Sequence, residues 1–382
     1  MKLLFASDSF KGSLSSAQTA ALLDAAAREV FGESVQCAGV AVADGGEGSA
    51  AALVEAGNGR WVEAAVHGPL MERVTARYGV LDERRAVLEM AEASGLCRIP
   101  PDRRDPLRTT SFGTGELIRH ALDRGASELI VAIGGSATND GGMGCARALG
   151  ARFLDEAGRE LDGCGADLER VRSIDLSGLD ARLRQCRITV LCDVTNPLCG
   201  PDGATQTFGA QKGATAETVA RLERGMVNYR DVIRRQFGCD PDRMPGSGAA
   251  GGLGTALAVF LGARLAPGID TVLDLIDFDR RLEGVDLVVT GEGCTDWQSC
   301  FGKVMRGVGE RAAAKGIAVV GLSGALGRGA EEICTHGVAA LMSAAEAPMP
   351  LAEAMARAEE LYYRAAVRMF RLVQVGMRIG NR

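Results

Sequence analysis

The chain has 382 residues, of which 47% are hydrophobic and 24% charged, and its formal net charge at pH 7 is −6. Its basic residues form no concentrated run, and its apolar stretches are far shorter than the about 20 residues that cross a bilayer, which argues against nucleic acid and membrane as partners. We therefore expect a folded cytoplasmic protein of two domains that acts as a monomer or homodimer.

The chain begins with alternating strands and helices. Residues 2–7 and 35–43 are apolar and predict buried strands, and a helix follows each of them. Ser15 and Gln18 have the spacing of a capping box, which predicts that the first helix starts there. Strands separated by helices form parallel sheets, whose ligands bind beyond the carboxyl ends of the strands. The polar segments that follow the two strands are therefore expected at a ligand site: 8–12 and 44–48.

The sequence pattern of the middle of the chain differs from that of the beginning, because it predicts antiparallel strands and one long helix. Later in the chain, the predicted strands again end in glycine-rich turns. We expect an α/β fold in which residues 65–284 form a second domain inserted into a parallel-sheet domain of residues 1–64 and 285–382. Residues 351–373 carry an apolar stripe of helical spacing, which predicts a packing helix. The other elements predicted here are strands at 61–67, 74–81, 85–90, 285–290 and 317–322 and a helix at 216–237.

Residues 130–142 combine a buried strand, a glycine-rich turn and the start of a helix. Backbone N–H groups ahead of a helix form an anion site, and this block has neither the P-loop nor the dinucleotide motif. The alternative is a tight connection in which Asn139 or Asp140 caps the helix. A second glycine block, 245–254, fits an anion site and close helix packing equally well. The candidate anion-binding residues are Gly134, Gly135, Ser136, Thr138, Asp140, Gly141 and Gly142.

Lysines and carboxylates beside glycines are the candidate catalytic groups. Phosphoryl transfer needs cationic charge on the phosphates, metal ligands and one carboxylate near the attacking hydroxyl. Lys11, Lys212 and Lys303 lie beside glycines, although any one of them alone is typical of a solvated surface lysine. Each acid alone could equally cap a helix or form a turn. The candidate acids, most of which follow predicted strands, are Asp8, Asp44, Glu47, Asp193, Glu292 and Asp296.

The cysteines and histidines point to no chemistry of their own. The 11 cysteines include no C-x-x-C pair, which argues against a disulfide framework or a zinc site, and we expect most of them to be small buried side chains. His67, His120 and His336 are far apart in the sequence, which argues against a histidine-based triad. Acid–base chemistry is therefore expected from carboxylates or lysine.

Eight motifs follow one another along the chain, at 8–13, 43–48, 89–96, 110–118, 134–142, 192–198, 211–214 and 291–293. Together they closely resemble the bacterial glycerate kinase family of the first type, and the resemblance runs from the first strand to about Gly324. The family implies two α/β domains, a discontinuous Rossmann-like domain and one inserted into it. It also implies ATP with Mg²⁺ and phosphorylation of D-glycerate, usually at the 2-hydroxyl, which gives 2-phosphoglycerate.

On this basis, the candidate residues can be given roles. We expect the ATP phosphates to lie against residues 134–142, and the substrate to lie in a cleft between the two domains. Asp193 or Asp296 is the candidate base, and Lys11 or Lys212 is the candidate cation on the transferring phosphate. The candidate magnesium ligands are Asp44 and Glu47, and the candidate substrate contacts are Asp8, Ser9, Asp44 and Cys294.

Two positions depart from the family pattern. Cys294 stands where the family usually has Arg, and Asp105 stands where Asn is common. A thiol cannot replace the bidentate donors of a guanidinium, so altered substrate preference or lower activity is expected. One alternative is a nicotinamide-dependent dehydrogenase, although the first strand leads to Asp-Ser-Phe-Lys instead of a glycine fingerprint. The other is a sensor of small acids without turnover, for which Cys294 is the only sign.

Overall fold

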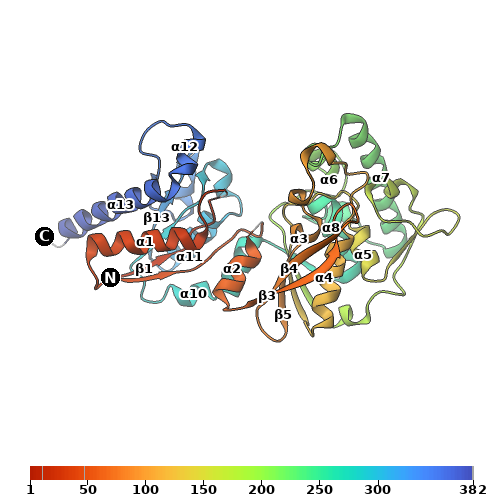
Figure 1. The fold of residues 1–382 in the computed structure, drawn as a ribbon, viewed down its shortest axis with the longest axis horizontal. Helices are drawn as coiled ribbons and strands as arrows, with labels where there is room; N and C mark the ends of the chain where they lie inside the picture. Colours follow the sequence, from red (N-terminus) through yellow and green to blue (C-terminus); the bar gives the residue numbers. More distant parts are fainter. Residues whose placement is uncertain (11, 47, 381–382) are drawn as a thin grey trace. The chain divides into compact units, whose positions relative to one another are not determined.

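The computed structural model describes residues 1–10, 12–46 and 48–380 and has the mixed α/β fold that the sequence predicts. It divides into two compact units, each with its own sheet (Figure 1). Unit 1 consists of Met1–Asp44 and Ile269–Arg382, and unit 2 of Gly45–Gly268. One unit is therefore discontinuous, and the other is inserted into it.

Unit 1 is built on a five-stranded parallel sheet in the order β15-β13-β11-β1-β2. Leu3 in β1 lies opposite Leu287 on one side and Cys37 on the other. The predicted strands are confirmed, although the one at 35–43 is shorter than expected, because its single partner, β1, ends at Phe5. The strands are β1 (Lys2–Phe5), β2 (Gln36–Gly39), β11 (Leu287–Thr290), β13 (Ala318–Ser323) and β15 (Ala340–Ser343), and a separate small sheet pairs β12 (Cys294–Thr295) with β14 (Ala325–Leu326).

The first helix of unit 1, α1 (Ser16–Phe31), starts at the predicted capping box. The Gln18 N–H donates to Ser15 Oγ (3.2 Å), and the Ser15 N–H donates to Gln18 Oε1 (2.9 Å), so two otherwise unpaired donors are satisfied. This helix packs alongside the C-terminal helix α13 (Ala358–Gly380) (Figure 1). The remaining helices are α9 (Gly268–Leu275), α10 (Phe278–Arg281), α11 (Val304–Ala314) and α12 (Leu351–Ala356), with short 3₁₀ helices η7 (Trp297–Cys300) and η8 (Ala330–His336).

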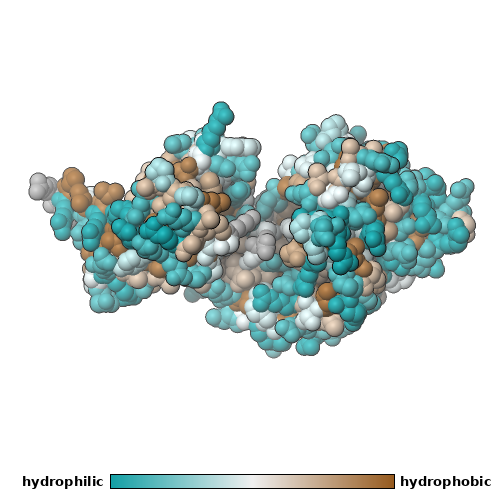
Figure 2. Space-filling model, turned by 45° about the horizontal axis from the view of Figure 1, so that its top comes forward, coloured by the Kyte–Doolittle hydropathy of each residue, from teal (hydrophilic) through white to brown (hydrophobic). Residues whose placement is uncertain are grey.

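The apolar stripe of the C-terminal tail is only partly a packing surface. Leu361, Tyr362 and Met369 are buried in the core of unit 1, as predicted, whereas Met355 and Leu372 are exposed. Further apolar side chains lie exposed on the last turns of α13, where Figure 2 shows brown atoms at the left end of the molecule: Val375, Met377 and Ile379.

Unit 2 contains a six-stranded mixed sheet in the order β10-β9-β6-β5-β4-β3. The predicted antiparallel pairs β3/β4 and β4/β5 are confirmed, and β5, β6, β9 and β10 run parallel. The segments that follow β6 and β9 therefore lie at the same edge of the sheet. The strands are β3 (Arg60–His67), β4 (Arg73–Val80), β5 (Arg85–Glu89), β6 (Glu128–Ala132), β9 (Arg187–Leu191) and β10 (Arg264–Ala266), and β7 (Arg152–Leu154) pairs with β8 (Ser173–Asp175).

The predicted long helix of unit 2 is confirmed as α7 (Ala216–Phe237). Within the described ranges, no helix combines the length and the apolar character needed to cross a membrane. The other helices are α2 (Ser49–Ala56), α3 (Ala91–Ser94), α4 (Phe112–Asp123), α5 (Met143–Ala148), α6 (Ala204–Phe208) and α8 (Ala249–Leu261), with 3₁₀ helices η1 (Leu96–Arg98), η2 (Pro101–Arg103), η3 (Gly165–Arg170), η4 (Ala181–Arg184), η5 (Ala210–Lys212) and η6 (Pro241–Arg243).

The boundaries of the two units differ from the predicted ones at 64/65 and 284/285. Because β3 pairs with β4 along its whole length and Val54 of α2 packs on Gly79 of β4, these segments belong to unit 2. At the other boundary, Ile269 packs on Gly307 of α11, so α9 and α10 belong to unit 1. Both boundaries depend on packing between segments that are far apart in the sequence. Local sequence patterns do not reveal such packing.

The expectation that most cysteines are buried was wrong. All 11 are free thiols, and their burial varies widely. Short apolar neighbourhoods in the sequence therefore do not determine whether a cysteine faces the core. Only Cys145, Cys199 and Cys300 are buried, whereas Cys97, Cys294 and Cys334 are exposed and the others are intermediate.

The two glycine blocks of unit 2 pack against each other backbone to backbone. Ala250, Gly251 and Gly252 all have left-handed backbone conformations, with φ of 54°, 67° and 90°. A Cβ added at Gly251 would lie 2.1 Å from the Thr138 carbonyl oxygen, and one at Gly252 would lie 2.8 Å from Gly141 Cα. Close packing therefore explains these glycines, which is the alternative that the sequence left open for 245–254.

We predict that Gly251→Ala lowers the free energy of unfolding by at least about 2 kcal/mol. A left-handed conformation costs a non-glycine residue about 1–2 kcal/mol, and overpacking adds about 1–3 kcal/mol. The matched control is Gly262→Ala, where φ is 69° but nothing lies within 4 Å of the added Cβ. Urea unfolding of both variants measures the difference, and equal losses would contradict the close-packing explanation.

Candidate active site

A pocket of about 630 Å³ lies at the carboxyl edge of the unit 1 sheet. It is formed by the segments that follow β1, β11, β13 and β15 and by α12. This is where a parallel sheet binds its ligands, as the sequence predicts. All four predicted substrate contacts, together with Glu292 and Lys303, line it: Asp8, Ser9, Asp44 and Cys294.

Hydrogen bonds at the strand ends hold the polar part of this pocket in place. The Asp8 N–H donates to the Gly291 carbonyl (2.9 Å), which joins the ends of β1 and β11. The Ser9 N–H donates to Asp8 Oδ1 (2.7 Å), so the carboxylate is held in a turn. Asp8, Asp44 and Lys303 are all partly exposed and line the same pocket, which gives it charged groups of both signs.

The two acids after β11 have different surroundings. Glu292 is 7% exposed and accepts hydrogen bonds from Thr295 Oγ1 (3.2 Å) and Ser299 Oγ. Burial raises the pKa of the Glu292 carboxyl, and the Ser299 hydrogen bond opposes this rise. Asp296 caps η7, because its Oδ1 accepts from the Gln298 N–H (2.8 Å), and it does not belong to the pocket lining. The sequence had left open that any of the candidate acids only caps a helix, and Asp296 does cap η7.

In unit 2, the loop after β6 surrounds a carboxyl group of its own. The Asp140 carboxylate is fully buried and accepts four hydrogen bonds, from Ser111 N (2.7 Å), Ser111 Oγ (2.8 Å), Gly142 N (3.0 Å) and Gly144 N (3.2 Å). Burial raises the pKa of Asp140, and these hydrogen bonds oppose the rise. Asp140 therefore caps α5, as the alternative interpretation had it. Ser111 was not predicted, although it lies in the 110–118 motif.

Only the first part of this loop faces solvent. Gly135 is exposed and has φ of 71°, Gly134 is intermediate, and Ser136 is 8% exposed. Further along, Ala137 N and Gly141 N already donate to backbone carbonyls. The part of the loop that a ligand can reach is therefore its start. The other predicted anion-binding residues are buried: Thr138, Asp140, Gly141 and Gly142.

Lys212 lies beneath this loop. Its side chain is 2% exposed at the end of η5, and Nζ donates to the Thr138 carbonyl at 2.7 Å. Burial lowers the pKa of Lys212 to about 7, while the nearby Asp140 carboxylate opposes this shift. In this conformation Lys212 supports the loop from inside the unit and does not face a ligand.

Asp193 follows β9 and is exposed at the carboxyl edge of the unit 2 sheet. Its Oδ1 accepts from the Gly268 N–H (2.7 Å), and a Cβ added at Gly45 would lie 3.2 Å from its Oδ2. The same added Cβ would lie 2.8 Å from Gly268 Cα. Asp193 therefore lies beside both ends of unit 2, where the chain enters and leaves it.

Two predicted site residues, Lys11 and Glu47, lie outside the described residues. Among the residues that the structure does describe, no group of three or more His, Cys, Asp or Glu side chains is arranged to hold a metal ion. Mg²⁺ usually takes only one or two carboxylates and completes its shell with water and substrate phosphates. The pocket carboxylates of Asp8 and Asp44 fit that requirement.

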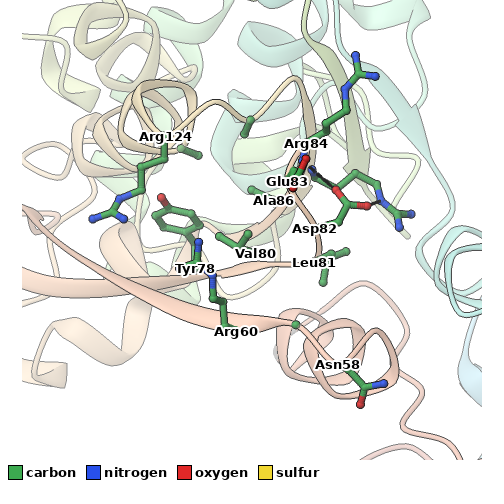
Figure 3. A pocket seen from close by; sticks show the side chains of 14 residues that line it. Asn58, Arg60, Tyr78, Val80, Leu81, Asp82, Glu83, Arg84, Ala86 and Arg124 are labelled. Atoms are coloured by element: carbon green, nitrogen blue, oxygen red, sulfur yellow. Dashed lines mark hydrogen bonds and ion pairs between the residues drawn. The ribbon is translucent and has the colours of Figure 1, made fainter.

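A second pocket, of about 520 Å³, lies in unit 2 near the amino ends of β5 and β6 (Figure 3). Tyr78 lies between the side chains of Arg60 and Arg124, and its hydroxyl is 3.1 Å from His120 Nδ1. Asp82 accepts from the Arg85 Nε–H at 2.7 Å. None of the predicted site residues lines this pocket, which is formed at the sheet edge opposite to the loop after β6.

The α/β fold and a strand-end pocket with carboxylates and a lysine are typical of an enzyme that binds a small ligand. The family model "Glycerate kinase family" matches residues 3–374. The chain therefore belongs to the glycerate kinase family. This membership favours the kinase over the dehydrogenase that the sequence left as an alternative.

Individual relatives match along nearly the whole chain. "Glycerate kinase" of Bacillus subtilis is 46% identical over 367 residues, which is 96% of each chain. "Glycerate 2-kinase" of Escherichia coli is 43% identical over 379 residues, which is 99% of each chain. A crystal structure of a putative glycerate kinase 2 from Salmonella typhimurium has a TM-score of 0.88 at 44% identity and covers 99% of both chains.

The position of Cys294 in the pocket leads to a prediction. Cys294→Arg should raise kcat/KM for glycerate roughly tenfold or more, because a charge-assisted hydrogen bond contributes about 1.5–3 kcal/mol. Steady-state kinetics with D-glycerate measure the change. The control is Cys334→Arg, which adds the same charge at an exposed cysteine of unit 1 outside the pocket. Unaltered kinetics in Cys294→Arg would mean that position 294 does not contact the substrate.

Proposed function

We propose that the chain is a cytoplasmic, ATP- and Mg²⁺-dependent kinase that phosphorylates the 2-hydroxyl of D-glycerate, with its active site in a cleft between the two units. The observation that supports it most is the strand-end pocket, which brings together Asp8, Ser9, Asp44 and Cys294. The name of the Escherichia coli relative, "Glycerate 2-kinase", supports the choice of hydroxyl. The direct test is ADP release with D-glycerate as acceptor and identification of 2-phosphoglycerate; formation of the 3-phosphate would contradict the choice of hydroxyl.

In the proposed reaction, the 2-hydroxyl oxygen forms a bond to the γ-phosphorus. The bond from the γ-phosphorus to its bridging oxygen breaks, ADP leaves with the electron pair, and the hydroxyl proton passes to a carboxylate. We assign this base to Asp193, an exposed acid just after a sheet strand, in preference to Asp296, which is only partly exposed and lies at the start of η7. Mg²⁺, when bound, supplies positive charge to the phosphates, with Asp44 and Glu47 as its proposed protein ligands.

The proposed phosphate contacts are the backbone groups at the start of the loop after β6. Gly134 and Gly135 reach the surface there, and the left-handed conformation of Gly135 turns the backbone. Lys212 then acts as a positioning residue that holds the loop through the Thr138 carbonyl. The cation on the transferring phosphate is assigned to Lys11.

Gly135→Val should raise the KM for ATP far more than the KM for glycerate. Valine disfavours the left-handed conformation at φ of 71°, so the loop must change its path where the phosphates are proposed to bind. Gly158→Val is the matched control, since φ is 73° there, the residue is exposed, and its turn lies in another part of unit 2. If the folded Gly135→Val enzyme has an unchanged KM for ATP, this loop is not part of the ATP site.

Asp193→Asn should lower kcat by roughly 10² to 10⁴, the usual contribution of a general base, with little effect on ATP binding. Asn keeps the shape and an oxygen that can accept from Gly268 N, so the local backbone should be preserved. Asp296→Asn serves as the comparison, and a smaller loss is expected there. If Asp296→Asn shows the larger loss, the assignment of the base is reversed.

A further inference from the structure

We propose that the adenine base of ATP binds in the apolar part of the unit 1 pocket, against α12 and residues 344–349. This inference rests on the proposed function, because it assumes that ATP is the phosphoryl donor. It adds a site for the base to the phosphate contacts proposed in unit 2.

The size and the lining of the pocket support this assignment. At about 630 Å³ the pocket is far larger than a three-carbon acid needs, and it lies in the range that encloses a nucleotide-sized ligand. The charged groups come from the strand ends, whereas the lining from residues 344–361 is mostly apolar. A flat heterocycle suits such a wall, because its faces are apolar and its edges are polar. The apolar wall comprises Ala344, Ala347, Pro348, Met349, Leu351, Ala354, Met355, Ala358 and Leu361.

The exposure of two large side chains also points to a ligand. Leu351 and Met355 of α12 line the pocket, yet they are 76% and 38% exposed. A Cβ added at Gly12 would lie 2.9 Å from Met355 Cε, so α12 lies directly against the loop that follows β1. A base on Met355 would therefore lie close to the loop that follows β1.

Backbone groups in the same wall can recognise the edge of the base. Within the described part of the chain, the N–H groups of Ala347 and Met349 donate to no protein acceptor, and neither residue belongs to a helix or strand. Nucleotide pockets combine such backbone groups with apolar side chains. The wall thus offers both stacking surface and hydrogen-bond donors, whereas glycerate would use only the polar end.

The test is to fill the apolar part and measure binding directly. Ala354→Trp places a large ring in the pocket, and Ala352→Trp places it on the exposed face of the same helix, outside the lining. Calorimetric titration with ADP should show at least about tenfold weaker binding to Ala354→Trp than to the control. Titration with inorganic tripolyphosphate, which lacks the base, should show equal binding to both. Ala354→Leu repeats the comparison with a smaller side chain if the tryptophan variant melts at a lower temperature.

Each outcome decides one question. Equal ADP binding by Ala354→Trp and Ala352→Trp, or no ADP binding by the unmodified enzyme, overturns the adenine site. Equal weakening of ADP and tripolyphosphate also overturns it, because the pocket would then hold the phosphates. If the unmodified enzyme binds ADP in this manner but forms no phosphoglycerate, the adenine site stands and the proposed kinase function fails.

Discussion

The hydrogen bonds around the buried Asp140 side chain are the interactions on which the loops at the carboxyl edge of the unit 2 sheet depend. A carboxyl group buried away from water is unfavourable unless hydrogen-bond partners surround it, and four donors from Ser111, Gly142 and Gly144 do so here. They tie the start of α4, the loop after β6 and the start of α5 to one point. The backbone of Gly251 then packs on the same loop through the Gly141 N–H. The exposed start of the loop can thereby hold a fixed shape.

Much of the architecture follows from local pattern. The buried strand β1, the capping box at Ser15 and Gln18, the antiparallel strands β3 to β5 and the helix α7 all occur where the sequence predicts them. In each case, the signal is periodicity or a short-range hydrogen bond, which neighbouring residues determine. The limits of β2 and of the two units depend on where a partner strand or helix ends, so the sequence predicted them less well.

For the candidate site too, the sequence predicted some features and missed others. The direction of the parallel strands predicted that Asp8, Ser9 and Asp44 lie at one site, and the family resemblance added Cys294; all four line one pocket. For the glycines of unit 2, sequence reasoning had no means of separating two causes, since an anion site and close backbone packing both select residues without Cβ. Lys212 is a related case, because lysines beside glycines are usually exposed and only the fold shows that this one is buried. The apolar wall of α12 carries no motif, so sequence patterns alone do not place it at a site.

The adjacency of Gly45 and Gly268 has a consequence for the order of folding during synthesis. Unit 2 is continuous in the sequence, whereas β1 must wait for β11, since Leu3 pairs with Leu287. Joining two such distant segments through a flexible chain would be entropically unfavourable and slow. Once unit 2 has folded, its two ends meet, so the connection between the two parts of unit 1 becomes equivalent to a short turn. Folded unit 2 therefore holds the two parts of unit 1 close together. The discontinuous sheet can then form quickly once the ribosome has released the last third of the chain.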